Sequence, residues 1–263
     1  MPYRSRRTEC IVLQTRDFGE SDRIVTLYSP DRGLLTAIAK GAKRSQKRFV
    51  NKLEECSHLD ISYCPAKHNR LHFLEEAELK EAFLFLRTDW RRYSTAMLAC
   101  ESVLRFTREH DPDRRIFSLL HWVLHSLQHA SSPLPGLVFF LLHLLDACGY
   151  RPELDCCATC SRSPKNNREG TFFLQPGGTL ICNRCSRNAQ LSRFSLSLQS
   201  LRFLHTAQRM TSGQMHRLQM PEPVVSECLS VLYHYSKYLL QCDIQSWKFV
   251  AQLSGKGYER KTI

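Results

Sequence analysis

The sequence predicts an α+β protein of several domains, in which a small N-terminal β-barrel precedes a helical domain that a cysteine-rich segment interrupts. Three observations support this prediction. Short β-branched and apolar runs crowd the first 80 residues, apolar residues then recur at spacings of three and four, and residues 151–190 replace that pattern with Cys, Gly, Asn and Arg. A chain of 263 residues is long enough for two domains, or for one domain with an insertion.

Five strands are expected in the first eighty residues, with no convincing helix between the first three. "TECIVLQTR" is apolar and β-branched, and "PDRG" has the composition of a type I turn. Five strands match the OB-fold, a barrel that commonly binds oligonucleotides; an SH3-like barrel is the main alternative, because periodicity alone does not separate the two. The expected strands span residues 8–16, 23–29, 34–42, 53–64 and 70–79.

Helices are expected after residue 80. "DPDRRIFSLLHWVLHSLQHA" begins with Asp111 and Pro112, which suit the N-cap and the first helical position. "SSPLPGLVFFLLHLLDACGY" is apolar all round and is therefore expected at the centre of a helical bundle. "SLQSLRFLHTAQRM" and "EPVVSECLSVLYHYSKYLLQC" resume the helical pattern. The predicted domains are a barrel at 1–80, a helical domain in two parts at 81–150 and 191–263, and a metal-binding region at 151–190.

The charge of the chain favours polyanionic partners. The formal net charge is +12 and the pI is about 9.3. Residues 1–50 hold eleven Lys or Arg and five Asp or Glu, so they carry half of this excess. The basic N-terminus is not followed by the apolar region of a signal peptide, and the longest apolar run is shorter than a membrane span. We therefore expect a cytoplasmic protein without a membrane partner.

Two C-x-x-C motifs, "CATC" and "CNRC", are separated by 21 residues. This spacing is typical of a zinc ribbon with four cysteine ligands, and "GTFFLQPGGTLIC" predicts the intervening hairpin with its turn at Gly177 and Gly178. Four unrelated thiols are the first alternative. A redox motif is the second, and it would predict a single pair near a βαβ unit. Four thiolates leave no open position, so one structural Zn²⁺ is expected, bound by Cys157, Cys160, Cys182 and Cys185.

The segment "KGAKRSQKRF" holds five basic residues with no acidic neighbour among them. One interpretation of this segment is a solvated loop. Nucleic acid is favoured because the segment lies between predicted strands, because "YRSRR" near the N-terminus adds three arginines, and because Tyr3 and Phe49 flank the charges and could stack on bases. The predicted interface residues are Arg4, Arg6, Arg7, Lys40, Lys43, Arg44, Lys47 and Arg48.

Motifs of several enzyme classes are missing from the sequence. It contains no G-x-x-x-x-G-K-[ST], G-x-G-x-x-G or G-x-S-x-G motif. His121 and His125 are four residues apart but lack the Glu of an H-E-x-x-H site, so packing or surface roles are expected for them. The acidic residues form no obvious two-metal cluster. We therefore expect no catalytic residues.

The order of barrel, helices, four-cysteine ribbon and helices on a basic chain resembles the RecO family of bacterial recombination mediators. The resemblance covers nearly the whole chain. It is most specific in "RDFGESDRIVTLYSPDRGLLTAIAKGAKRSQKRF", in "FLLHLLDACGYRPELDCCATC" and in "QSWKFV" near the end.

This resemblance implies a non-enzymatic DNA repair and recombination protein, associated with the nucleoid. Such a protein binds single- and double-stranded DNA, anneals complementary strands, and acts on DNA coated by the single-strand-binding protein SSB, whose acidic C-terminal tail it contacts. With RecR it promotes loading of RecA. The basic segment would then form part of a DNA track on the barrel. Arg23 and Arg16 would join it, although Asp17, Glu20 and Asp22 are candidates to pair with them.

Two other functions remain compatible with parts of the sequence. A basic barrel with a ribbon also suits an RNA-binding zinc-ribbon protein of the translation or transcription machinery. A metal-dependent nuclease is the third hypothesis, but it needs an open metal site, which four cysteines do not provide.

Overall fold

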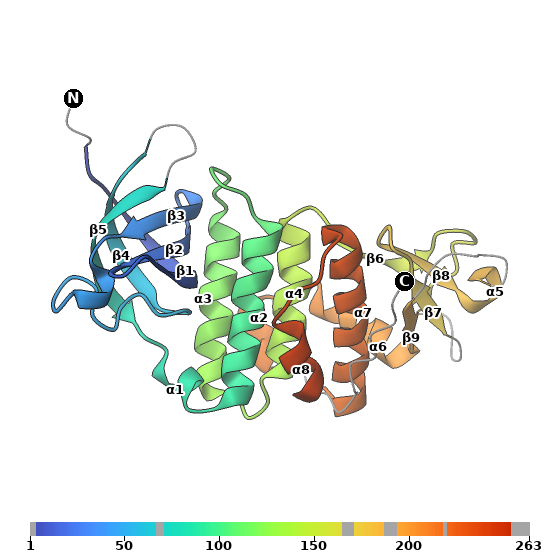
Figure 1. Ribbon diagram of the computed structural model, residues 1–263. Helices are drawn as coiled ribbons and strands as arrows, with labels where there is room; N and C mark the ends of the chain where they lie inside the picture. Colours follow the sequence, from blue (N-terminus) through green and yellow to red (C-terminus); the bar gives the residue numbers. More distant parts are fainter. Residues whose placement is uncertain (1–3, 67–70, 165–170, 187–193, 218–219, 254–263) are drawn as a thin grey trace. The chain divides into compact units, whose positions relative to one another are not determined.

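The computed structural model describes residues 4–66, 71–164, 171–186, 194–217 and 220–253. The chain divides into two compact units, Met1–Ala130 and Ser131–Ile263. The first unit holds a β-barrel and three helices, and the second holds the remaining helices and a small sheet (Figure 1). The predicted combination of barrel, helices and cysteine-rich sheet is therefore confirmed.

Five strands form the closed barrel, in the order β1-β2-β3-β5-β4. Neighbouring strands are antiparallel except β3 and β5, which are parallel. Five strands closed in this way confirm the predicted OB-fold. The strands are β1 (Arg6–Phe18), β2 (Asp22–Ser29), β3 (Gly33–Ala39), β4 (His58–Cys64) and β5 (His72–Glu81).

Two strand boundaries differ most from the prediction, because the backbone turns left-handed there. The third strand ends at Ala39, and Gly41, with a φ of 68°, leads into the short 3-10 helix η1 (Ala42–Arg44). The fourth strand begins only at His58, since Cys56 has a φ of 68°. A left-handed residue interrupts the extended backbone of a strand, so the alternation of apolar and polar residues alone overestimated the length of both strands.

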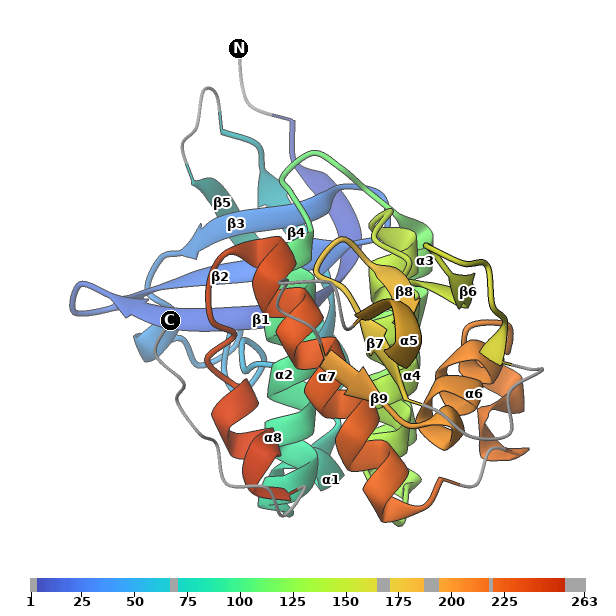
Figure 2. The same cartoon turned by 90° about the vertical axis from the view of Figure 1, so that its right-hand side faces the viewer.

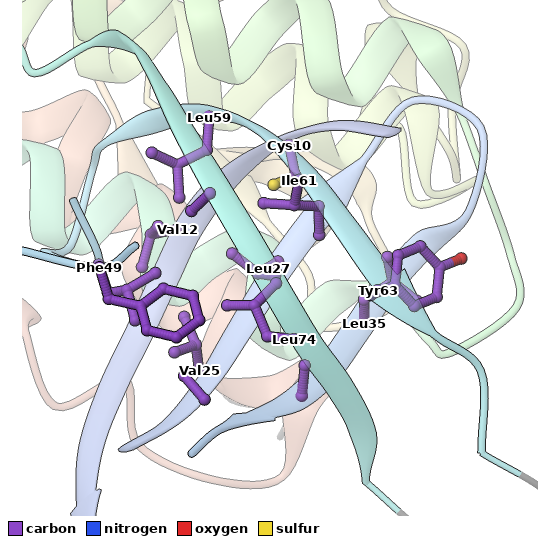
Figure 3. Packing of buried hydrophobic residues seen from close by; sticks show 14 of the residues in the cluster. Cys10, Val12, Val25, Leu27, Leu35, Phe49, Leu59, Ile61, Tyr63 and Leu74 are labelled. Carbon is purple, nitrogen blue, oxygen red and sulfur yellow. The ribbon is translucent and has the colours of Figure 1, made fainter. Parts of the chain in front are cut away.

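The barrel core is filled by side chains that alternate along the strands (Figure 3). Cys10 and Val12 of β1 point into it, whereas Ile11 and Leu13 are buried on the outer side, where β1 contacts α2. Phe49 is 3% exposed and belongs to the same cluster. The prediction that Phe49 stacks on bases is therefore wrong, because its ring is part of the barrel core. Tyr3 lies outside the described residues.

Helices α1 (Leu84–Arg87), α2 (Trp90–Phe106) and α3 (Arg114–His129) complete the first unit. Figure 1 shows α2 and α3 side by side. Asp113, not Asp111, is the N-cap of α3, and its carboxylate accepts a hydrogen bond from the Arg115 N–H. The Asp111 carbonyl instead lies under Gly33, where a Cβ atom would be 2.7 Å from it.

The second unit is built around α4 (Leu134–Ala147), which is buried along most of its length and packs against α6 (Leu198–Ala207) and α7 (Glu222–Leu240). Figure 2 shows α7 lying along α4. A four-stranded sheet has the order β6-β8-β7-β9. Its strands are β6 (Glu153–Cys157), β7 (Phe172–Leu174), β8 (Thr179–Cys182) and β9 (Phe194–Leu196), and the unit also contains α5 (Asn183–Ser186), η3 (Ser212–Arg217) and α8 (Trp247–Leu253).

Among the residues that the structure describes, no helix is both long enough and apolar enough to cross a membrane.

Candidate nucleic-acid interface and metal centre

The basic segment leaves β3 and folds back onto the hairpin that joins β1 and β2. The Gly41 N–H donates to the Asp22 carboxylate at 2.8 Å, and the Lys43 N–H donates to the Ser21 carbonyl at 2.9 Å. The hydrogen bond from Gly41 is the main reason that the pKa of Asp22 is lowered. These bonds fix the start of the segment against the hairpin.

Three of the predicted interface cations lie beside acidic side chains of the hairpin or of the following loop. Lys43 is 3.0 Å from Asp17, and Arg23 lies 3.3 Å from Asp17 and 3.1 Å from Glu54. Arg44 is 3.9 Å from Glu20. The hydrogen bond from Lys43 lowers the pKa of Asp17. The expectation of unpaired charge is therefore wrong for Lys43 and Arg44; the suspected pairing of Arg23 with Asp17 is confirmed.

Two other cations of the segment lie beside β5. Arg48 donates to the carbonyls of Glu75 and Lys40, at 3.4 and 3.3 Å, and its guanidinium lies 5.0 Å from the Phe49 ring centroid. The Lys40 ammonium lies 6.0 Å from the Phe73 ring centroid. Within the described part of the chain, Lys40, Lys47 and Arg48 form no ion pair with a carboxylate. The positive charge on this side of the barrel is thus available to a partner.

The N-terminal arginines separate onto two faces of β1. Arg7 bridges Asp60 and Glu78 at 2.8 and 2.9 Å, and its hydrogen bond to Asp60 raises its pKa further. Arg6 is opposite Tyr63 in the register with β4 and is exposed. Burial of the His72 ring on β5 and the charge of His110 are the larger causes of that ring's lowered pKa, to which the charge of Arg6 also contributes. Arg6 therefore joins the β5 side, whereas Arg7 is occupied by acidic partners; Arg4 is exposed beyond the strand.

We name two groups from these contacts. The β5 group consists of Arg6, Lys40 and Arg48, and the hairpin group consists of Arg23, Lys43 and Arg44. Sequence reasoning missed the exposed aromatic residue of the hairpin, Phe18, which ends β1 and is 52% exposed. Its position before Gly19, at the end of an apolar strand, was the available signal.

The four predicted cysteines converge in the second unit. Cys157 ends β6, Cys182 ends β8, and Cys185 lies in α5. With Cys160 they place one sulfur each within 4.8 Å of the others, and the Cys160 and Cys182 sulfurs are 3.7 Å apart. Cys156 is exposed and lies outside this group. The group could hold one metal ion.

The surrounding backbone prepares Cys157 for ionisation. Burial raises its pKa, but N–H donors of Cys182, Cys160 and Thr159 outweigh that effect and lower it to about 6. The pKa of Cys185 is raised to about 12, mainly by hydrogen bonds to the sulfurs of Cys160 and Cys182. Four thiolates so close together repel one another, so their joint ionisation requires a cation.

The hairpin between β7 and β8 brings the second cysteine pair back to the first. The sequence predicted this hairpin, and the structure shows that its strands pair Phe172 with Cys182 and Leu174 with Leu180. Gly178 has a φ of 81°, and a Cβ atom there would lie 2.5 Å from the Tyr235 hydroxyl. The left-handed φ of this tight turn requires glycine, and a Cβ atom would also displace the Tyr235 side chain of α7.

Family models match both parts of the chain. Residues 1–83 match the model described as "Recombination protein O N terminal", and residues 87–248 match "Recombination protein O C terminal". The chain belongs to the RecO family. The RecO assignment predicted from the sequence is thereby confirmed.

Several curated relatives bear the name DNA repair protein RecO. The protein from Syntrophobacter fumaroxidans is 36% identical over 221 residues, which cover 77% of this chain and 86% of the relative. The proteins from Syntrophus aciditrophicus and Roseiflexus sp. are 29% and 30% identical; the matches cover 96% and 95% of this chain, and 98% and 86% of the relatives. This RecO-family chain is therefore a DNA repair protein.

Proposed function

We propose that this protein is a non-enzymatic mediator that binds single- and double-stranded DNA through its barrel and anneals complementary strands. The β5 group carries the proposal, because Arg6, Lys40 and Arg48 lie around one strand of an OB-fold without carboxylate ion pairs among the described residues. Lys47 and Arg4, both exposed, extend this surface. Cations along one strand suit a phosphate backbone.

The hairpin group would act differently. Its cations already have partial partners in Asp17, Glu20 and Glu54, so a DNA phosphate must compete with these carboxylates. The exposed ring of Phe18 lies next to Gly19, whose carbonyl accepts from the Lys43 ammonium at 3.1 Å. A base stacked on Phe18 would place its phosphate near Lys43. Annealing would follow because two DNA backbones with neutralised phosphates can approach each other, while bases splayed on the protein remain free to pair.

We propose one structural zinc ion at the four-cysteine group. Zinc–sulfur bonds of about 2.3 Å in a tetrahedron place the sulfurs about 3.8 Å apart, which fits the 3.7 Å between Cys160 and Cys182. Cys157, Cys160, Cys182 and Cys185 would hold the ion and fill its coordination sphere. Zinc would neutralise the charge of the thiolates and would cross-link β6, β8 and α5. With four sulfur ligands it would have no open position for a reactive water.

Three protein partners follow from the family proposal: RecR, the SSB C-terminal tail, and RecA indirectly. A pocket of about 320 Å³ in the second unit suits an acidic peptide with an apolar end. Leu154, Pro164 and Leu201 give it apolar walls, and Arg202 and His205 give it basic groups. Asp155 also lines the pocket but is held by His205 at 2.7 Å and Arg209 at 3.1 Å. We propose this pocket as the site for the SSB tail. We also propose that the protein acts in the bacterial cytoplasm, at the nucleoid.

The deciding experiment is annealing of two complementary oligonucleotides coated with the cognate SSB, without ATP. We expect this protein to accelerate annealing. No acceleration, despite measurable binding to bare DNA, would overturn the mediator function. A marked preference for structured RNA would favour the RNA-binding alternative, and metal-dependent cleavage of DNA by the pure protein would favour a nuclease.

A further inference from the structure

Two histidines and two glutamates meet on the outer side of the barrel, within the first unit. His58 begins β4 and lies opposite Glu81, the last residue of β5. His121 comes from the middle of α3. His58, Glu81 and His121 each place one ligand atom within 4.8 Å of the other two. Three elements that are distant in sequence thus bring two imidazoles and a carboxylate to one point.

Individual contacts show how closely these groups approach. The Nε2 atom of His121 lies 3.5 Å from a Glu81 carboxylate oxygen, and the two imidazole centroids are 5.0 Å apart. The Nε2 atom of His58 lies 2.7 Å from the carboxylate of Glu9 on β1. A carboxylate at this distance fixes the orientation of the His58 ring, as in carboxylate–histidine–metal arrangements.

The surroundings hold the group in place and bury His58, whereas the side chains of His121 and Glu81 are 35% and 31% exposed. His58 is 8% exposed. Phe117 makes an edge contact with His58, and Phe83 makes one with His121. The Gln128 amide donates to the second oxygen of Glu81 at 3.0 Å. Carboxylate ligands of metal ions are commonly hydrogen-bonded in this way.

We propose that His58, Glu81 and His121 bind a second metal ion, a transition-metal dication of the zinc class, with Glu9 orienting His58. Two imidazoles and one carboxylate suit zinc or a similar ion, whereas magnesium and calcium prefer oxygen ligands alone. Three protein ligands leave one position for water. The ion joins the end of β5 and the start of β4 to α3, so its binding stabilises the packing of this helix on the barrel.

The test is a metal count on the full-length protein, stripped with chelator and reloaded with Zn²⁺ under reducing conditions. We expect two ions per chain in the unaltered protein and one in His121→Gln. His125→Gln is the matched control, because His125 is an exposed residue one turn further along α3, and it should keep two ions. One ion in the unaltered protein, or two in folded His121→Gln, would overturn the proposal.

Cobalt titration separates this site from the four-cysteine centre. The Co²⁺ ion bound at the four cysteines should produce sulfur-to-metal charge-transfer absorption, and the Co²⁺ ion bound at the histidines should not. His121→Gln should lose only the ion that binds without this absorption. If His121→Gln does not fold, Gln128→Ala keeps every ligand and removes the hydrogen bond to Glu81. We expect it to weaken the second site about 10- to 100-fold. An unchanged affinity for the second ion would show that this ion binds away from Glu81, which would overturn the proposal.

Discussion

The barrel and the cysteine-rich sheet are both small β structures, but they are stabilised in different ways. The barrel has strands of 7 to 13 residues around a continuous apolar core. The strands of the cysteine-rich sheet have only 3 to 5 residues and converge on four sulfurs. Apolar burial suffices for the barrel, whereas the short strands of the second sheet would gain stability from the proposed zinc ion. On this proposal the four sulfurs serve the structure of the second unit, and the barrel surface carries the proposed DNA-binding charges.

Removal of the metal centre should give the largest effect and should be confined to the second unit. We expect Cys182→Ser to release the proposed zinc and to abolish hydrogen-exchange protection around residues 153–157 and 179–182, with β1 unaffected. Cys156→Ser is the control, since this neighbouring thiol is exposed and outside the group. Full zinc retention and an unchanged exchange pattern in Cys182→Ser would contradict the ligand assignment.

Phe49→Ala should destabilise the barrel instead, by about 3–5 kcal/mol, because it leaves a cavity in the core. Denaturant unfolding measures this loss. Val50→Ala, at a neighbouring side chain that is 45% exposed, should cost far less. Weaker DNA binding by Phe49→Ala without loss of stability would instead mean that the ring contacts bases.

The two groups of cations on the barrel should differ in their contribution to DNA binding. Replacing Lys40 and Arg48 by Ala should weaken binding to single-stranded DNA and reduce the slope of log affinity against log salt by about 1.4, at about 0.7 for each phosphate contact. The matched double variant Lys43→Ala/Arg44→Ala should change the slope less, because carboxylates already compete for these cations. Fluorescence anisotropy at several salt concentrations measures both. Equal slopes for the two variants would remove the distinction between the groups.

Phe18→Ala should cost about 1–3 kcal/mol of binding to single-stranded DNA, the usual value for one stacked base. Its barrel stability should change little, since the ring is 52% exposed. Phe18→Tyr keeps a stacking face and should retain the affinity. If Phe18→Ala binds as tightly as the unaltered protein, no base stacks at the hairpin.

The smallest effect is expected at the pocket of the second unit. Arg202→Glu should weaken binding of an SSB tail peptide about fivefold, or about 1 kcal/mol, as for a partly solvated ion pair. Its affinity for bare DNA should remain unchanged. Lys248→Glu changes an exposed charge on α8, outside the lining residues, and should bind the peptide normally. An equal loss in both variants would indicate general electrostatic attraction rather than this pocket.

Features that depend on a local sequence pattern could be predicted, whereas contacts between distant segments could not. Strand alternation was sufficient to predict the five strands of the barrel, and the spacing of the C-x-x-C motifs was sufficient to predict the sulfur group. Phe49 is aromatic among cations in sequence, and only the folded chain shows its ring in the core. Asp17 pairs with Lys43, which is 26 positions away in the sequence, so the residues around either one do not indicate this ion pair. His58, Glu81 and His121 come from three separate elements, so no sequence motif indicates that they lie close together.

The seam between β3 and β5 has a consequence for synthesis of the chain on the ribosome. Among the residues that the structure describes, two residue pairs join these strands, Ala37 with His72 and Ile38 with Phe73. β1 and β2 can form a hairpin early, but β1 pairs with β4, and the barrel closes only when β5 arrives. Until then the open edges of β1 and β3 remain templates for pairing with other nascent chains. Chaperone protection of the first eighty residues during translation would shorten this exposure.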